Sequence, residues 1–449
     1  MTLLKHATVL TLDPADTVYP GGWILFGASG IVALGPAGSE PALGSGDEVH
    51  DLSGHCVLPG LVNAHTHTPM VLFRSHAEGR SLLSMEGWYN AIRVPELSLL
   101  PEDIGPATAL SCAEMALSGT TTFADQYFYA EEVAAAIEAS GLRAVLTYGI
   151  VQLGDAARGA QELERATRFV EKLKRSSGRV IGWLGPHAPF VDNTEELLVA
   201  EAHTAQRLGV GLHLHMAVGP EDNEHTLATR GVTAAVALRD IGFFGSRTLV
   251  AHCLDLSPED IAVFADAPAV SVVHCPTAGM RAGKRAICPV IDLQAAGVTV
   301  ALGTDNVANN NSYDLLAEAR MAGLAASLRE GRAQPLSPTA LLRMATLEGA
   351  CALGLEMLVG SLEVGKSADL IALDLRRAGY SDGPDLAALL VYSGSGRDVR
   401  HSWVGGEQLV QDGALVRQDL SQLKADFSEA YTRFWGRVYA REQQEEVPS

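Results

Sequence analysis

Several features are scarce or missing in this 449-residue chain, and each absence excludes a class of protein. The six cysteines are widely spaced with no CxxC pair, so we expect neither a disulfide framework nor a cysteine-based zinc knuckle. Nowhere do about 18 apolar residues run together, which excludes a membrane-spanning helix. The N-terminus MTLLKHATVLTLDPAD has a broken apolar run and an early acid, which does not fit an export signal. We therefore expect a soluble, cytoplasmic protein.

Basic residues are also in short supply. Lys and Arg total 33 against 53 Asp and Glu, a formal charge of −20 that repels both nucleic-acid phosphates and anionic lipid headgroups. We expect neither nucleic acid nor a membrane surface as a partner, and instead a small-molecule substrate. With 47% hydrophobic and 19% charged residues, the chain has the composition of a globular protein with a large core.

The order of sequence patterns predicts two structural units. Residues 1–57 contain short strand patterns separated by turns, and β patterns return over 357–449 before a helical, charged tail. Between them, residues 58–356 alternate apolar strand runs with Ala-rich helical stretches, as in TTTFADQY followed by AEEVAAAIEASG. Such alternation predicts parallel strands joined by crossover helices. We expect an α/β fold, a (β/α)8 TIM barrel, with a small β-sandwich formed from both termini.

Polar residues cluster where the predicted barrel strands end, which is where a parallel barrel carries its catalytic groups. A single buried histidine is more often structural than a ligand, so the prediction depends on the whole set. Residues i and i+2 of a strand face the same side, so two of them can chelate one ion while the others arrive from neighbouring strands. Imidazole and carboxylate ligands together suit zinc or iron. The set comprises His65, His67, His187, His213, His215, His252, His274 and Asp305.

The motifs PGLVNAHTH, SGTTTFADQY, GPHAPF, HLHMA, VAHCLDLS, LGTDNVANNNSYDLL and GSLEVGKSADLIALD occur in this order along nearly the whole chain. In this the chain resembles the amidohydrolase superfamily, in particular the branch of S-adenosylhomocysteine and methylthioadenosine deaminases and triazine hydrolases. The resemblance implies one divalent metal per chain and a homo-oligomer, either dimer or tetramer. Zinc is favoured by its general abundance, with iron as the alternative. The implied metal ligands are His65, His67, His215 and Asp305.

The same resemblance implies roles for residues around the metal. Asp305 would take a proton as hydroxide attacks an sp² carbon, and His252 would polarise the developing charge, with His187 near the substrate. Glu86 and Trp88 fall where nucleoside deaminases place a carboxylate for ribose hydroxyls and a nearby aromatic ring. Their alternative roles are an exposed glutamate at a helix start and a packing tryptophan. His213 lies deeper in its strand than His215, and we interpret it as structural.

Two departures from the family pattern bear on the substrate. Tyr148 stands where related nucleoside deaminases often carry arginine, which weakens the case for a carboxylate-bearing nucleoside. The loop GMRAGKRAICPV adds Arg281, Lys284 and Arg285, which either contact an anionic group near the barrel mouth or remain solvated.

Val218 is the largest departure. Deaminases of this branch carry a glutamate three residues after the ligand histidine, and it protonates a ring nitrogen; valine cannot carry a proton. The main prediction is still a metal-dependent aminohydrolase of a purine, nucleoside, pterin or triazine, with the proton shuttle supplied by His187, His252, Glu221 or Glu224. One alternative is a hydrolase that removes a non-amine leaving group, as a chlorohydrolase does. Another is a metal-bearing protein that binds a ligand without turnover.

Overall fold

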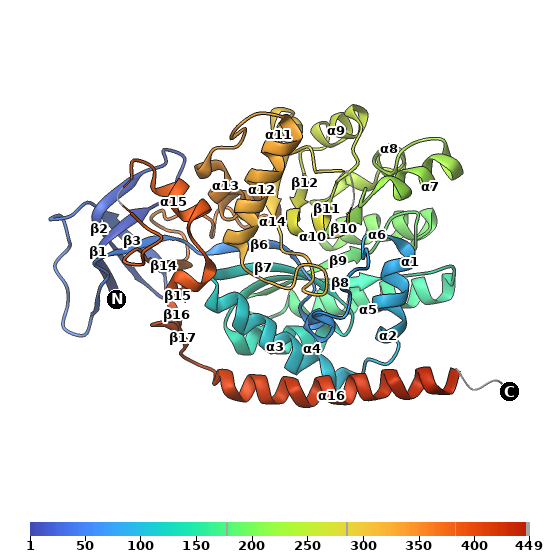
Figure 1. The fold of residues 1–449 in the computed structure, drawn as a ribbon, viewed down its shortest axis with the longest axis horizontal. Helices are drawn as coiled ribbons and strands as arrows, with labels where there is room; N and C mark the ends of the chain where they lie inside the picture. The colour runs from blue at the N-terminus through green and yellow to red at the C-terminus, as the bar shows by residue number, and fades with distance from the viewer. Residues whose placement is uncertain (177, 284–285, 382, 446–449) are drawn as a thin grey trace.

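A parallel eight-stranded sheet forms the centre of the molecule (Figure 1). The computed structural model describes residues 1–176, 178–283, 286–381 and 383–445. The sheet runs in chain order, and its first and last strands meet where Asp305 N donates to His65 O at 3.0 Å. The predicted (β/α)8 barrel is confirmed. Its strands are β6 (Leu61–Thr66), β7 (Thr120–Tyr127), β8 (Arg143–Ile150), β9 (Val180–Pro186), β10 (Leu212–Met216), β11 (Thr248–His252), β12 (Val270–His274) and β13 (Thr299–Leu302).

Helices follow the strands and cover the outside of the barrel (Figure 1). Small and β-branched side chains such as Ala64, Ala124, Val145 and Val273 fill the inside, because alternate residues of each strand point inward. The helices are α3 (Pro101–Leu117), α4 (Ala130–Ser140), α5 (Ala156–Leu173), α6 (Glu195–Leu208), α7 (Pro220–Arg230), α8 (Ala234–Asp240), α9 (Pro258–Ala265), α10 (Pro276–Arg281), α11 (Val290–Ala295), α12 (Leu315–Glu330), α13 (Pro338–Met344) and α14 (Leu347–Leu353).

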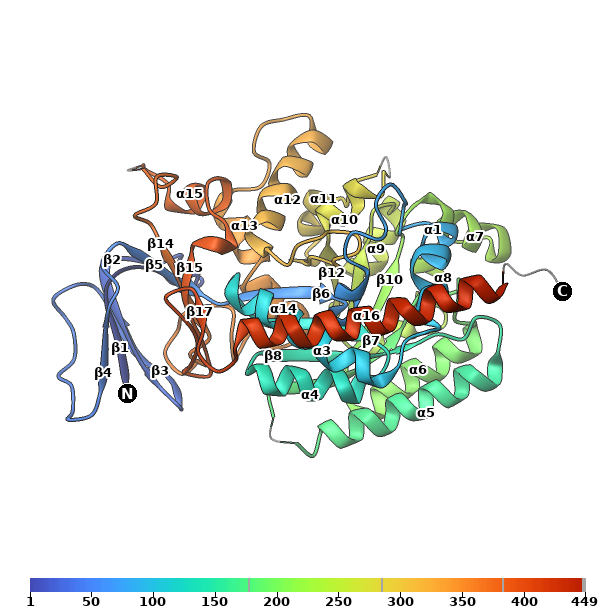
Figure 2. The same ribbon diagram turned by 60° about the horizontal axis from the view of Figure 1, so that its bottom comes forward.

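Both ends of the chain build a second sheet to one side of the barrel (Figures 1 and 2). β5 (His55–Pro59) pairs with β14 (Leu370–Asp374) in antiparallel register, which joins the two halves as predicted. The boundaries after residues 57 and 356 stay predictions. The remaining strands are β1 (Thr2–Leu10), β2 (Val18–Gly27), β3 (Gly30–Gly35), β4 (Glu48–Asp51), β15 (Val399–Val404), β16 (Glu407–Gln411) and β17 (Ala414–Leu415), with α15 (Leu386–Tyr392) between β14 and β15.

Four short helical segments follow β6. They are the 3-10 helix η1 (Thr68–Phe73), α1 (Met85–Trp88), the π-helical turn η2 (Tyr89–Arg93) and α2 (Val94–Glu96). The long C-terminal helix α16 (Leu420–Glu445) lies along the side of the barrel over α3 (Figure 2). No described helix combines the length and apolar character that a membrane crossing requires.

Candidate metal centre

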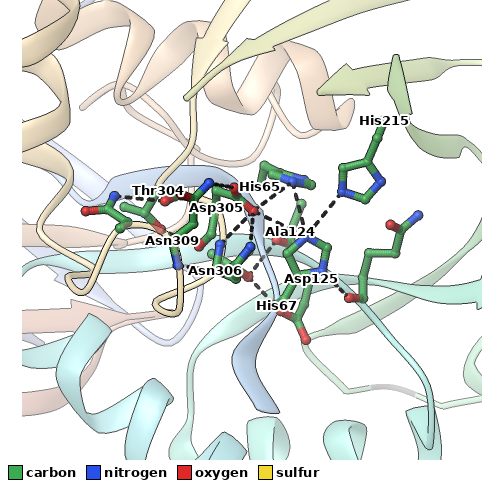
Figure 3. Close-up of polar contacts among 12 residues, drawn as sticks. His65, His67, Ala124, Asp125, His215, Thr304, Asp305, Asn306 and Asn309 are labelled. Atoms are coloured by element: carbon green, nitrogen blue, oxygen red, sulfur yellow. Dashed lines mark hydrogen bonds and ion pairs between the residues drawn. The ribbon is translucent and has the colours of Figure 1, made fainter. Parts of the chain in front are cut away.

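Three imidazoles meet at the carboxyl ends of the barrel strands (Figure 3). Nε2 of His67 lies 3.3 Å from Nε2 of His65 and 3.2 Å from Nε2 of His215. The carboxylate of Asp305, which follows β13, places Oδ1 3.6 Å from Nε2 of His65 and 3.5 Å from Nε2 of His67. Nitrogens of His65, His215 and His252 also lie within 4.8 Å of one another. The structure therefore brings the four expected ligands and His252 together.

The hydrogen bonds made by Nδ1 of two of these rings determine which ring nitrogen carries the proton. Nδ1 of His67 donates to the carbonyl of Gln126 at 2.7 Å, and Nδ1 of His215 donates to that of His187 at 3.0 Å. A carbonyl only accepts, so each of these rings carries its proton on Nδ1 and a lone pair on Nε2. Lone pairs 3.2 Å apart repel each other, and a cation among them removes that repulsion. This donor set therefore fits a divalent metal ion.

Burial, followed by the neighbouring imidazoles, lowers the pKa of His65 and His215 well below the ordinary range, so both rings are neutral at pH 7. Nδ1 of His65 lies 2.8 Å from Nε2 of His213, which sits behind it inside the barrel. The position of His213 agrees with a supporting rather than a ligating role.

Asparagine amides hold Asp305 in place. Oδ1 accepts from the backbone N of Asn306 at 2.7 Å and from its Nδ2 at 2.9 Å, while Oδ2 accepts from Nδ2 of Asn309 at 3.1 Å. Asp305 has φ +60° and His252 has φ +77°, conformations that L-residues adopt at a cost of about 1–3 kcal/mol each. The surrounding structure thus holds both residues in strained positions beside the site.

A buried aspartate that the sequence did not single out anchors the ligand segment. Asp125 on β7, labelled in Figure 3, accepts from Thr66 Oγ1 at 2.7 Å, Thr68 N at 2.7 Å and Thr68 Oγ1 at 2.8 Å. Because Thr66 and Thr68 flank His67, these bonds fix the backbone that carries the ligand. Burial raises the pKa of Asp125 to about 6.

A cavity that is partly open to solvent lies over the histidine cluster. Its walls are largely apolar, and the described lining residues include no lysine or arginine. The three carboxyl groups on its surface belong to Glu96, Asp192 and Asp305. The apolar walls include Leu82, Trp88, Ile92, Phe128, Val191 and Val218.

The substrate residues expected from the sequence divide into two groups. His187 and Trp88 both line the cavity, with ring centroids 5.3 Å apart. Glu86, by contrast, is exposed on α1 and is not among the described lining residues. Residues two apart on a helix point in different directions, so Glu86 faces solvent while Trp88 faces the cavity, and the ribose contact expected of Glu86 stays a prediction.

The expected proton-shuttle and charge-recognition residues have other surroundings. Glu224 is exposed and away from the described lining, and the side chain of Glu221 lies outside the described residues. Tyr148 faces α5 and donates to Glu162 at 3.0 Å. Arg281 donates to both carboxylate oxygens of Glu78, at 2.8 and 2.7 Å. Lys284 and Arg285 lie outside the described residues.

Two buried acids of the cavity were missed from the sequence. Glu96 accepts from the Tyr127 hydroxyl at 2.6 Å, and burial raises its pKa. Asp192 accepts from Nδ1 of His187 at 2.5 Å. Burial alone would lower the pKa of His187, but the charge and hydrogen bond of Asp192 raise it. The only sequence signal was the position of Asp192 five residues after His187.

Comparison with known proteins extends these observations. Residues 56–409 match the model of the amidohydrolase family. A 5-methylthioadenosine/S-adenosylhomocysteine deaminase of Pelotomaculum thermopropionicum is 38% identical over 94% of this chain and 96% of its own length. A 5'-deoxyadenosine deaminase of Methanosarcina acetivorans is 38% identical over 93% and 94%.

Solved structures show the same fold. The zinc-bound structure of an adenosine deaminase from Xanthomonas campestris has a TM-score of 0.91 at 28% identity and covers 97% of this chain and 98% of its own. A zinc complex of atrazine chlorohydrolase from Arthrobacter aurescens has a TM-score of 0.87 at 26% identity, over 96% of this chain and 100% of its own.

Proposed function

This chain belongs to the amidohydrolase family, and on that premise we propose that it deaminates an adenine nucleoside with a small apolar group at the 5′ position. It is a metal-dependent hydrolase of carbon–nitrogen bonds, and the relatives named as 5′-deoxyadenosine and 5-methylthioadenosine deaminases supply the substrate class. The observation that selects within this class is the lining of the cavity.

S-adenosylhomocysteine carries an amino-acid group with a carboxylate, which needs a cation or several donors when it leaves water. The described lining of the cavity has no lysine or arginine, and its acids Glu96 and Asp192 are paired with Arg93 and His187. Arg281, which is not among the described lining residues, is already paired with Glu78. A methyl or methylthio group gains from contact with the apolar walls instead. We therefore expect 5′-deoxyadenosine and 5′-methylthioadenosine to be better substrates than S-adenosylhomocysteine.

We assign the metal to His65, His67, His215 and Asp305, and among divalent ions we propose zinc. Such an ion, when bound, supplies a Lewis acid that makes hydroxide available near neutral pH. Asp305 accepts a proton from the attacking water and later delivers it to the amine that leaves as ammonia. His252 lines the cavity with a buried Nδ1 that has no partner among the described residues, and it polarises the charge that develops as water adds to the carbon.

The test combines metal content with ammonia release. We expect about one zinc per chain, and ammonia from 5′-deoxyadenosine and 5′-methylthioadenosine with kcat/KM at least about tenfold above S-adenosylhomocysteine, which corresponds to 1.4 kcal/mol. Equal kcat/KM for all three would contradict the substrate assignment. Metal without ammonia from any purine, nucleoside, pterin or triazine would contradict deamination.

Val218 favours one other candidate, a hydrolase that releases a non-amine group. This side chain lines the cavity where a deaminase of this branch would place an acid, and the fold resembles that of the atrazine chlorohydrolase. Halide or thiol release from triazines without ammonia from nucleosides would support that candidate. A loaded metal site with no product from either panel would support a ligand-binding protein.

We also propose that the protein is a cytoplasmic homo-oligomer, a dimer or tetramer. Light scattering of the purified protein tests the assembly, and a monomer at micromolar concentration would contradict it.

A further inference from the structure

A buried carboxylate beside the cavity has no part in the proposed metal centre. The side chain of Asp192 is 1% exposed. Oδ1 accepts from the backbone N of Ala188 at 3.0 Å, and Oδ2 accepts from Nδ1 of His187 at 2.5 Å. Among the described residues, no lysine or arginine forms an ion pair with it. A carboxylate removed from water needs a partner, and the imidazole of His187 is that partner.

This contact holds His187 at one nitrogen and leaves the other for the cavity. The ring of His187 is close to those of Trp88 and His215, with centroid distances of 5.3 and 4.8 Å. The backbone carbonyl of His187 accepts from the backbone N of His215 at 2.9 Å, so the loop after β9 is also connected to β10. Because Asp192 engages Nδ1 and His187 lines the cavity, Nε2 is the ring nitrogen that a substrate can reach.

The proposed deamination needs a proton donor that Val218 does not provide. When the water oxygen bonds to the carbon that carries the amine, a C=N electron pair of the heterocycle moves onto a ring nitrogen. That nitrogen must gain a proton for the intermediate to be stable. Val218 lines the same cavity but has no proton to give.

We propose that Asp192 is a positioning residue that presents Nε2 of His187 to the heterocycle, and that His187 gives the ring nitrogen its proton. This inference rests on the proposed function. One water proton passes through Asp305 to the amine, whose C–N bond breaks to release ammonia. The other returns to His187 through solvent as the C=O bond forms, so water and amine give the oxo product and ammonia.

The experiment is steady-state ammonia release by the zinc-loaded enzyme with 5′-deoxyadenosine. We expect Asp192→Asn to lower kcat about 100-fold and to change KM less than about threefold. The asparagine keeps its oxygen on Ala188 N and turns its N–H towards Nδ1, which locks His187 in a neutral tautomer. Zinc content and Tm should match the parent. As a matched control, Asp398→Asn removes a buried carboxylate that lies in η4 (Gly396–Asp398), outside the cavity lining, and should leave kcat unchanged.

A second substitution separates this role from simple packing. Val218→Glu supplies an acid by another route, so we expect Val218→Glu/Asp192→Asn to recover kcat to within about fivefold of Val218→Glu alone. If Asp192→Asn does not fold, His187→Gln, which leaves Asp192 and its bond to Ala188 in place, should show the same loss of kcat.

Three results would overturn the inference: an unchanged kcat in Asp192→Asn, a loss confined to KM, or equal losses from Asp192→Asn with and without Glu at 218. A parent enzyme that releases no ammonia would instead overturn the proposed function on which the inference rests.

Discussion

Asn306 and Asn309 bind the two carboxylate oxygens of Asp305, and together they set its direction towards the histidines. Replacing Asp305 by Asn removes both the negative ligand and the proton acceptor. We expect kcat to fall by at least about 1000-fold, measured as ammonia release with metal content determined in parallel.

Asn309→Ala is the matched comparison for Asp305→Asn, because it removes only the bond to Oδ2. It should cost about 10- to 100-fold in activity or metal affinity. Activity of Asp305→Asn close to that of the parent would show that the reaction does not depend on this carboxylate.

Glu318 on α12, which is not a proposed metal ligand, provides a test of pH dependence. It accepts from Thr277 N at 3.1 Å and Asn310 Nδ2 at 2.9 Å, and burial raises its pKa from 4.5 to about 7. The unfolded chain loses this proton near pH 4.5 and the folded chain near pH 7, so stability falls as pH rises through this window and levels off above it. The loss is up to about 3 kcal/mol.

Glu318→Gln cannot ionise, so urea unfolding at pH 5 and pH 8 should show a smaller loss of stability for this variant than for the parent. Parallel pH curves for the two proteins would show that Glu318 does not titrate in this window.

At the level of single residues, the sequence predicted the site residues that lie at the ends of barrel strands, and few of the others. Histidines at i and i+2 of a strand had to share a face, so the meeting of His65 and His67 could be foreseen. The inward turn of Trp88 and the outward turn of Glu86 depend on a short helix followed by a π-helical turn, for which the sequence contains no recognisable pattern. The contact of Asp192 with His187 depends on loop geometry in the same way.

Among the elements, the C-terminal helix α16 packs against η1, a contact that the sequence did not predict. Trp435 donates from Nε1 to the carbonyl of Leu72 at 2.9 Å and stacks on His76 with ring centroids 3.8 Å apart, while Phe434 packs on Phe73. The C-terminal helix therefore supports η1, the turn that directly follows His67.

Trp435→Ala should lower the free energy of unfolding by about 3–5 kcal/mol, because it removes a buried indole and the hydrogen bond that its N–H donates to Leu72 O. Urea unfolding measures this effect. The control on the same helix is Tyr439→Ala, whose side chain is half exposed and should cost less than about 1 kcal/mol. Equal losses for the two variants would mean that the helix is not anchored at Trp435.

Alternating strand and helix patterns predicted the barrel because each crossover places an apolar strand between helical stretches. The helical spacing of the C-terminal residues likewise predicted a helix there, but the pattern did not show which elements that helix packs against. Which surface covers which is decided by side-chain fit over the whole molecule, as between Trp435 and η1, and a local pattern does not contain that information.

For the molecule as a whole, an ion pair links the barrel to the terminal sheet. Arg143 on β8 donates to both oxygens of Asp369, at 3.1 and 3.2 Å, and the Asp369 side chain is 1% exposed. Asp369→Asn leaves the guanidinium without its charge partner in a buried place. We expect a loss of about 3–5 kcal/mol in the free energy of unfolding.

The comparison for Asp369→Asn is Asp292→Asn, which breaks the exposed pair with Arg329 and should cost less than about 1 kcal/mol. Chemical unfolding of both variants measures the difference, and indistinguishable curves would mean that the junction does not depend on the buried pair.

The pairing of β5 with β14 also has a consequence for how the chain is made. The N-terminal strands leave the ribosome early, but the partner of β5 is synthesised only after the entire barrel. At about 5–20 residues per second, the roughly 300 residues between them keep that sheet edge open for about 15–60 s. During this interval the nascent chain exposes the backbone of β5 and apolar side chains such as Val57, which makes it a natural client for a chaperone.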